Sequence, residues 1–303
     1  MSPAAASALA ADAQAIALSW YSANGRDLAF RRTTDPWAIL VSEVMAQQTQ
    51  AARAAEAWTR FMAQFPTPAS LAGASPATVI RAWRGLGYNR RALALRTAAI
   101  AIVEGHGGRV PDDVDALQRL PGIGPYTARA VLAIAFNRPV AALDVNIRRV
   151  IQRAFLDPDG LELQPRDLQA SADALVPAND AAAWTHALMD IGAAFCRPRH
   201  PRCEACPLRA SCRYAAVTSA QRPGASKASE ARAPRRSPRF AVTTRWLRGR
   251  ILDRLRDTPD GTWATFEGPI GEHGHEAVLR SLARLSAEGL IEADGDRARL
   301  GIG

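Results

Sequence analysis

Apolar residues recur at intervals of three and four positions along most of the chain, up to about Ala216. This spacing places apolar side chains on one face of an α-helix and so predicts helices that bury that face in a core. We therefore predict that this part of the chain is helical almost throughout. The clearest examples are Trp58, Phe61, Met62 and Phe65 in one stretch, and Val131, Ile134 and Ala135 in another.

The pattern changes beyond this helical part. Residues 219–239 are polar and rich in Pro, Ser and Arg, a composition that buries too little apolar surface to fold by itself. Apolar periodicity then returns and predicts two helices, Thr244–Leu255 and Glu276–Glu288. Leu290–Leu300 is typical of a β-hairpin, with its turn at Asp294-Gly295. Helices followed by a β-hairpin indicate a winged-helix module.

A chain of 303 residues accommodates one large domain and a smaller one. We assign residues 1–216 to an all-α domain, 217–239 to a basic linker and 240–303 to a small winged-helix-like α+β domain. Many winged helices bind DNA, but others make protein contacts. The partner of this module, DNA or a protein, therefore stays open at this point.

The charge balance favours a polyanionic partner. The formal net charge is +9 and the isoelectric point about 10.3, and each phosphate that a protein neutralises releases condensed counterions. A compositional bias towards Ala and Arg is the alternative explanation for the positive charge. No stretch has the roughly 18 uninterrupted apolar residues of a membrane span, and the Ala-rich residues 4–17 are interrupted by Asp12 and Gln14. We expect a cytoplasmic protein.

All four cysteines lie close together, with the spacing C-x6-C-x2-C-x5-C. Four thiolates suit either a tetrahedral zinc ion or a [4Fe-4S] cluster, and a cytoplasmic chain is not expected to keep them as disulfides. Zinc sites more often use two C-x2-C pairs, so this spacing favours the iron-sulfur cluster without excluding zinc. The predicted ligands are Cys196, Cys203, Cys206 and Cys212.

The loop between the first two cysteines is basic. It contains Arg197, Arg199 and Arg202, together with His200. A metal cluster that fixes this loop would present its positive charge to a phosphate backbone. A solvated run of charges is the alternative.

A second motif, Leu120-Pro-Gly-Ile-Gly-Pro-Tyr-Thr-Ala128, lies between two helical stretches. Gly122 and Gly124 permit a tight turn, and Pro125 suits the first turn of the next helix. Backbone N–H groups at such a helix start can bind phosphate. We therefore expect Gly122, Gly124 and Thr127 to contact DNA through a helix-hairpin-helix motif, although a G-x-G turn alone is a weak signal.

Two carboxylates are candidates for acid-base chemistry. Asp144 precedes a helical run that extends to Ala154, a position typical of a helix N-cap. Glu43 lies in a helix that opens at Asp35-Pro36, at the edge of its apolar face, where partial burial would raise the pKa of the carboxyl group. A purely structural cap for Asp144 and solvent exposure for Glu43 both remain open.

Together, these segments resemble the endonuclease III superfamily and, more closely, its adenine DNA glycosylase branch, the MutY family. The resemblance covers about residues 12–216. It implies a helix-hairpin-helix DNA glycosylase fold with an iron-sulfur cluster loop. Besides the hairpin and the cysteine spacing, it rests on the motifs SEVMAQQTQ at 42–50, GLGY at 85–88, LDVNIRRV at 143–150 and MDIG at 189–192.

The catalytic roles of the family carry over onto matching positions. The resemblance implies that Glu43 protonates a ring nitrogen of adenine and later helps to activate water, and that Asp144 stabilises the oxocarbenium-like sugar. Asn146 would orient Asp144. Tyr126 stands where bifunctional relatives carry a Schiff-base lysine, which implies hydrolysis alone. The only lysine of the chain, Lys227, lies in the linker.

The resemblance also implies how the duplex is held. Gln48 and Tyr88 would wedge into double-stranded DNA while the target nucleotide is flipped out. The expected function is base excision repair by a monomer that hydrolyses the N-glycosidic bond of adenine mispaired with 8-oxoguanine or guanine. We expect it at the nucleoid.

The chain departs from the family pattern at two points. Val145 follows the catalytic aspartate where the family has glycine, and the segment from Glu230 to Gly303 is too short for the usual C-terminal domain that reads 8-oxoguanine. The preference for the opposite base therefore stays open. Two alternatives remain: a thymine or uracil glycosylase for mismatches with guanine, and a winged-helix DNA-binding regulator with a redox-sensitive cluster.

Overall fold

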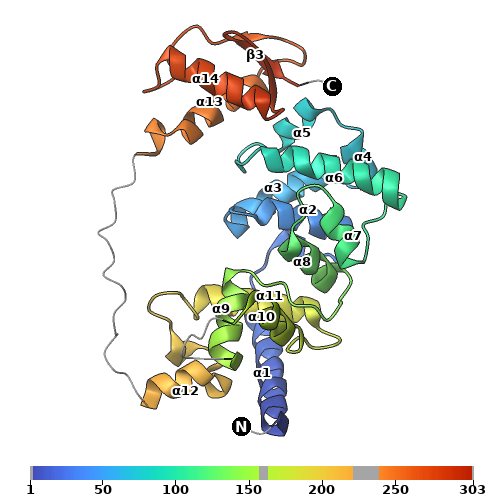
Figure 1. Ribbon diagram of the computed structural model, residues 1–303, viewed down its shortest axis with the longest axis vertical. Helices are drawn as coiled ribbons and strands as arrows, with labels where there is room; N and C mark the ends of the chain where they lie inside the picture. Colours follow the sequence, from blue (N-terminus) through green and yellow to red (C-terminus); the bar gives the residue numbers. More distant parts are fainter. Residues whose placement is uncertain (1–2, 157–162, 221–238, 302–303) are drawn as a thin grey trace. The chain divides into compact units, whose positions relative to one another are not determined.

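The computed structural model describes residues 3–156, 163–220 and 239–301, except the side chains of 3–9 and 218–220. It is mostly helical, with strands near the C-terminus, which confirms the predicted fold class (Figure 1). Residues 221–238 of the predicted linker, including Lys227, lie outside the described residues. Within the described part, no helix is long and apolar enough to cross a membrane.

The chain divides into two compact units. The first unit comprises residues 1–43, 112–118 and 123–228, and the second comprises residues 44–111, 119–122 and 229–303. Each unit is thus built from separate stretches of sequence. We placed the predicted domain boundaries, at 216 and 240, at the two ends of the polar linker. They stay a prediction.

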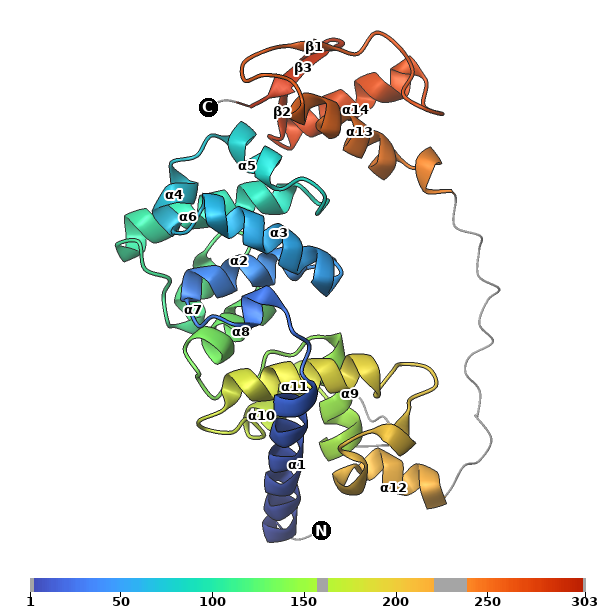
Figure 2. The same ribbon diagram turned by 180° about the vertical axis from the view of Figure 1, so that it is seen from behind.

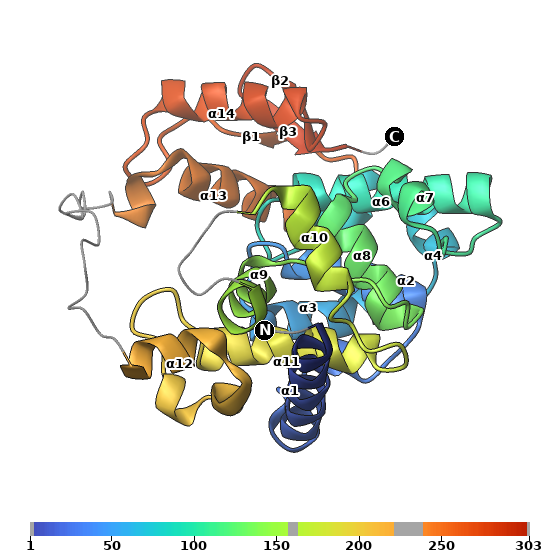
Figure 3. The ribbon, with the colours of Figure 1, turned by 60° about the horizontal axis from the view of Figure 1, so that its bottom comes forward.

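The first unit is helical. Its centre is α11, which packs against α1, α8 and α9 (Figures 1 and 3). The elements are α1 (Pro3–Asn24), a short turn η1 (Ala29–Arg31), α7 (Val114–Arg119), α8 (Pro125–Ala135), α9 (Val145–Ile151), a π-helical turn η2 (Gln152–Leu156), α10 (Pro165–Asp173), α11 (Ala181–Ala194), the 3-10 turns η3 (Cys203–Ala205) and η4 (Arg209–Ser211), and α12 (Arg213–Ala220).

Close packing of α9 against α11 depends on a glycine. A Cβ atom built on Gly192 would lie 2.7 Å from the Cβ atom of Asn146, which is too close for any other residue. The buried side chains of Trp184, Leu188 and Ile151 belong to the same core. The glycine of the MDIG motif therefore lets α9 approach α11, which fixes the position of the residues at the start of α9.

The second unit contains a helical part and the C-terminal module. Helix α2 (Pro36–Ala46) begins in the first unit and ends in the second. In the helical part, α6 packs against α4 and α5. Its helices are α3 (Ala51–Gln64), α4 (Pro68–Ala72), α5 (Pro76–Ala82) and α6 (Arg90–His106).

The C-terminal module has the predicted winged-helix-like organisation (Figure 2). Its sheet has the order β1-β3-β2 and is antiparallel, with Asp294 paired to Arg297. The two helices agree with the prediction to within one residue at each end. The elements are η5 (Phe240–Val242), α13 (Thr244–Arg256), β1 (Ala264–Thr265), α14 (His275–Ala287), β2 (Ile291–Asp294) and β3 (Arg297–Leu300).

Two details of the module differ from the sequence prediction. The hairpin turns at Gly295-Asp296, one residue later than expected, because Gly295 takes the positive φ of 58° that the turn requires. Strand β1 has only two residues, too few for its periodicity to be visible in the sequence. Neither difference changes the class of the module.

The module and α5 share one hydrophobic core. Ala77 and Ile80 of α5 are fully buried in the same cluster as Leu247, Ile251 and Leu282 of the module. All of these residues belong to the second unit. The C-terminal module therefore packs against α5 and is not an independent domain connected only by the linker.

Candidate active site

Glu43 is a buried carboxyl group. Helix α2 is enclosed from Trp37 to Met45, and Glu43 itself is 9% exposed. Burial raises the pKa of Glu43 to about 7; a hydrogen bond from Tyr126 lowers it, the nearby Asp144 raises it, and Arg31 lowers it. The solvent-exposed alternative for Glu43 is wrong, because the helix is buried on more than its apolar stripe.

Tyr126 is the second residue of α8, directly after Pro125. Burial and the two carboxylates, Glu43 and Asp144, raise the pKa of Tyr126 well above its usual value. The phenol therefore keeps its proton and donates a hydrogen bond to the Glu43 carboxylate. Its effect on Glu43 opposes that of burial.

Asp144 is the N-cap of α9, as the local pattern predicted. Its Oδ1 accepts hydrogen bonds from the backbone N–H groups of Asn146, at 2.9 Å, and Ile147, at 2.6 Å. Its Oδ2 accepts from Asn146 Nδ2 at 3.0 Å. These three hydrogen bonds fix the orientation of the Asp144 carboxylate. The cap also positions Asp144 near Glu43 and Tyr126, so capping and a place in the site do not exclude each other.

Val145 occupies the first turn of α9 beside Asp144. Its side chain is 75% exposed, which is unusual for a large apolar residue. The departure from the family's glycine is therefore not explained by core packing.

A chain of hydrogen bonds connects Asp144 with the cysteine loop. Asn146 Oδ1 accepts from Arg149 Nη2 at 2.8 Å, and the same nitrogen donates to the carbonyl of Gly192 at 2.8 Å. Arg149 Nε donates to the carbonyl of Cys196. One guanidinium thus holds the amide that orients Asp144 and the backbone of the first cysteine. Arg149 was not among the site residues predicted from the sequence, although its place in the LDVNIRRV motif was a signal.

Arg31 and Asp190 form a buried ion pair close enough to Glu43 to affect its pKa. Asp190 is 3% exposed and accepts hydrogen bonds from both Nη atoms of Arg31, at 2.8 and 2.9 Å, and from Arg26 Nε at 2.7 Å. These arginines hold the pKa of Asp190 below its usual value despite its burial. Asp190 is the acidic residue of the MDIG motif. Its role is to fix Arg31, which in turn lowers the pKa of Glu43.

The hairpin has the predicted backbone geometry. Gly122 has a φ of 79°, and a Cβ atom built on it would lie 2.9 Å from the Cβ of Ala94. Gly124 is the N-cap of α8, without a side chain to cap the helix. Thr127 is 2% exposed. The whole residue is therefore buried, and the DNA contact expected at Thr127 stays a prediction.

The two predicted wedge residues have unusual backbones. Gln48 has a φ of 53° and Tyr88 a φ of 45°, in the left-handed region that non-glycine residues rarely adopt. Gln48 is exposed, and Tyr88 is 44% exposed. Strained residues that stay exposed are typical of functional positions. These backbone angles could not be predicted from the pattern of residues.

Arg91 holds the loops of both wedge residues. Its Nη1 donates to the carbonyls of Val44, at 2.8 Å, and Gln47, and its Nη2 donates to the carbonyl of Gly87 at 3.3 Å. Its guanidinium carbon lies 5.4 Å from the centre of the Tyr88 ring. Arg91 therefore bridges the end of α2 and the GLGY loop, a role that was not predicted from the sequence.

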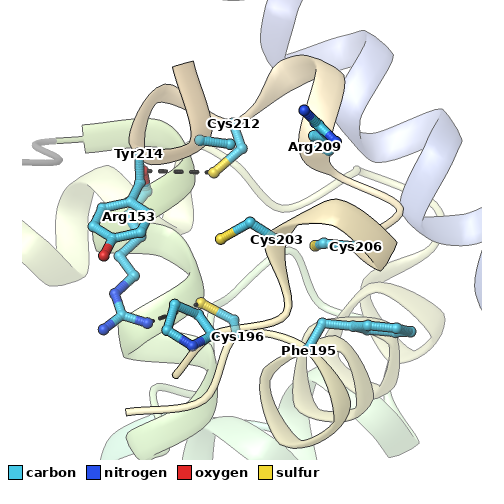
Figure 4. A pocket seen from close by; sticks show the side chains of 10 residues that line it. Arg153, Phe195, Cys196, Cys203, Cys206, Arg209, Cys212 and Tyr214 are labelled. Carbon is cyan, nitrogen blue, oxygen red and sulfur yellow. Dashed lines mark hydrogen bonds between the residues drawn. The ribbon is translucent and has the colours of Figure 1, made fainter. Parts of the chain in front are cut away.

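The four cysteines line one pocket. Cys196, Cys203, Cys206 and Cys212 form no disulfide with one another, and Figure 4 shows their sulfur atoms facing a common space. Arg153 Nη1 donates to Cys196 Sγ at 3.6 Å. Burial raises the pKa of Cys206 to about 11, and the other three cysteines add to the rise. Within the described residues, no three His, Cys, Asp or Glu side chains converge on a single-ion site.

The basic loop is exposed. Arg197, Arg199 and Arg202 all face solvent, and among the described residues none of them forms an ion pair. His200 has a positive φ of 52° in the same loop. The Arg153 Nη1 bond to the carbonyl of Arg197, at 2.8 Å, ties the base of this loop to the cysteine pocket.

The structure thus brings Glu43, Tyr126, Asp144 and Asn146 together within the first unit, which also contains the cysteines and the basic loop. Gln48, Tyr88 and Gly122 belong to the second unit.

Comparisons with known proteins show the family to which the chain belongs. The family described as "HhH-GPD superfamily base excision DNA repair protein" matches residues 41–176, a range that includes Glu43, Tyr126 and Asp144. In the solved structure of a thermostable thymine-DNA glycosylase, 98% of the chain superposes on 69% of this chain, with a TM-score of 0.65 and 29% identity. The fold and the site define a base excision glycosylase.

The sequence relatives are more specific. The adenine DNA glycosylase of Mycolicibacterium smegmatis is 40% identical over 289 residues, which are 94% of this chain and 95% of the relative. That of Mycobacterium tuberculosis is 43% identical over 79% of this chain and 77% of the relative. The chain belongs to the adenine DNA glycosylase family of the HhH-GPD superfamily. The first match is long enough to include most of the C-terminal module.

Proposed function

We propose that this chain hydrolyses the N-glycosidic bond of adenine mispaired with 8-oxoguanine or guanine, as a monofunctional and monomeric glycosylase. The observation that carries the proposal is a group of three side chains. Glu43 is buried, the Tyr126 phenol donates a hydrogen bond to it, and Asp144, the N-cap of α9, lies nearby. This is the arrangement of two carboxylates in different environments that glycoside hydrolysis uses. The proposed site of action is the nucleoid in the cytoplasm.

The chemistry follows from the two environments. With its raised pKa, Glu43 is half protonated near neutral pH and can donate its proton to a ring nitrogen of adenine as the bond from C1′ to the base breaks. The Asp144 carboxylate then faces the developing positive charge on the sugar. Water attacks C1′, and the Glu43 carboxylate accepts the proton that the water loses. The products are free adenine and an abasic sugar.

The experiment separates binding from chemistry. Glu43→Gln and Asp144→Asn are nearly isosteric, so each should bind a duplex with adenine opposite 8-oxoguanine as tightly as the wild type. Single-turnover adenine release should fall by roughly two or more orders of magnitude, the scale of a lost acid-base group. Release at the wild-type rate by either variant would contradict the role proposed for that residue.

The monofunctional part of the proposal rests on Tyr126 and on the single lysine. Lys227 is the only side-chain amine of the chain, and Tyr126 keeps its proton beside Glu43. No buried amine is therefore expected to attack C1′. Borohydride should trap little covalent protein-DNA adduct, and efficient trapping that survives Lys227→Ala, with the N-terminal amine blocked, would contradict this.

We propose that the four cysteines hold a [4Fe-4S] cluster. Four cysteine thiols around one pocket are the donor set of such a cluster. When bound, the cluster would fix the loop of Arg197, Arg199 and Arg202 for contact with phosphates. Purified protein should contain about four iron atoms per chain, whereas stoichiometric zinc without iron would refute this assignment. Cys206→Ala should then weaken DNA binding by loosening the loop.

The wedge and hairpin residues complete the proposal. Gln48 and Tyr88 would enter the duplex, and the hairpin with Gly122, Gly124 and Thr127 would bind phosphate. A thymine or uracil glycosylase is the second candidate, favoured by the structural similarity to a thymine-DNA glycosylase. Adenine is favoured by the higher identity to adenine DNA glycosylases and by the acid at Glu43, since a purine leaves most easily after protonation of its ring.

A further inference from the structure

The C-terminal module brings a second guanidinium to Tyr88. Arg245 lies in the first turn of α13, and its guanidinium carbon is 4.6 Å from the centre of the Tyr88 ring. A Cβ atom built on Gly87 would lie 3.7 Å from Arg245 Nη2, so this guanidinium also lies against the GLGY loop. Apart from this contact, both Arg245 and Tyr88 are exposed to solvent. The ring is thus held by Arg91 from its own helical part and by Arg245 from the module.

A buried arginine fixes α13 beside this loop. Arg256 is 8% exposed, and its Nε donates to the carbonyl of Ile80 at 3.0 Å. Its Nη2 donates to Asn89 Oδ1 at 2.7 Å, and Asn89 directly follows Tyr88. Arg81 Nε returns a hydrogen bond to the carbonyl of Arg256 at 3.1 Å. With the shared core described above, these bonds make α13 a rigid support for Arg245.

We propose that Arg245 is a positioning residue for Tyr88, through which the C-terminal module takes part in opening the base pair. The inference rests on the proposed wedge function of Tyr88. A guanidinium over an aromatic ring restricts the orientations of the ring. A wedge that is already oriented loses less side-chain freedom when it enters the stacked bases, and so it binds them more readily. The module then acts on the substrate without reading any base itself.

The test uses the full chain and a duplex with adenine opposite 8-oxoguanine and 2-aminopurine next to the adenine. The fluorescence of 2-aminopurine reports unstacking, and single-turnover release reports the chemistry. Arg245→Ala should slow the fluorescence rise about two- to five-fold, the factor expected for a cation-π contact at an exposed site. Arg245→Lys should retain part of the wild-type rate. The matched control is Arg250→Ala on the same helix, where Arg250 pairs with Asp253.

A double-mutant cycle identifies the route of the effect. If Arg245 acts through Tyr88, Arg245→Ala should change nothing further in a Tyr88→Leu background, in either the fluorescence rise or the dissociation constant. Arg245→Ala could instead have its full effect in the Tyr88→Leu background and reduce the salt dependence of DNA binding by about one phosphate contact. That result would overturn the inference in favour of direct phosphate binding by Arg245. Wild-type behaviour of Arg245→Ala would overturn it as well. A wild-type protein that releases no adenine would instead contradict the proposed function.

Discussion

Glu43 titrates near neutral pH because burial opposes its charged form more strongly than Tyr126 and Arg31 favour it. As the proposed acid, it must be protonated in the reactive complex. Single-turnover adenine release should therefore decrease as the pH rises through about 7. A pH profile that stays flat from pH 6 to pH 9 would show that another group supplies the proton.

Replacing Tyr126 should change the pH at which adenine release decreases. Its hydrogen bond lowers the pKa of Glu43, so Tyr126→Phe should raise that pKa further and move the decrease in rate to higher pH. The measurement is the same pH profile for both proteins. A shift to lower pH would mean that Tyr126 acts on Glu43 through something other than this hydrogen bond.

The raised pKa also has a cost in stability. Between the usual pKa of 4.5 and about 7, the folded protein binds more protons at Glu43 than the unfolded chain does, so the free energy of unfolding falls as the pH rises through this window. Glu43→Gln removes this loss. Relative to the wild type, the variant should gain about 2 to 3 kcal/mol between pH 4.5 and pH 7.5. Denaturant unfolding at both pH values measures it, with the exposed Glu104→Gln as the control that should not change.

The residues of the site were predictable to different degrees. Asp144 was recognisable because a cap before an amphipathic run is a local pattern, and the cysteines were recognisable by their spacing. The burial of Glu43 was not, because it depends on the packing of every face of α2. Arg149 and Arg91 were missed for the same reason. Their main partners distant in sequence are backbone carbonyls, which every residue carries and which the pattern of side chains therefore does not reveal.

Helix α9 connects the site with the cysteine loop through Arg149. Arg149→Gln should break the bonds to Asn146, Gly192 and Cys196 and leave Asp144 less well oriented. We expect adenine release to fall by roughly 10- to 100-fold, the scale for loss of a supporting hydrogen bond. Arg148→Gln is the matched control, since Arg148 is exposed on the same helix. Equal rates for the two variants would contradict an orienting role for Arg149.

At the level of elements, the periodicity of apolar residues predicted the helices well. The ends of α13 and α14 agree to within one residue, because both helices have one clear apolar face. The hairpin turn was misplaced by one residue, since Asp294-Gly295 and Gly295-Asp296 are both acceptable turn pairs. The pairing of β1 with β3 could not be predicted, because two residues carry no alternation.

At the scale of the whole molecule, the C-terminal module is structurally tied to α5. Deleting everything from Glu230 onward would expose Ala77 and Ile80 and remove the bonds of Arg256. The truncated protein should therefore unfold at a lower temperature by several degrees, the shift that accompanies the loss of about 1 to 3 kcal/mol. Thermal unfolding measures it. An unchanged melting temperature would mean that the module does not pack against α5 in solution.

The central claim is best tested by base release from a panel of duplexes with A, T or U opposite G, 8-oxoguanine or C. We expect release of adenine opposite 8-oxoguanine and opposite guanine, because a purine leaves most easily after Glu43 protonates its ring. Release of thymine or uracil opposite guanine, with adenine left in place, would contradict the account.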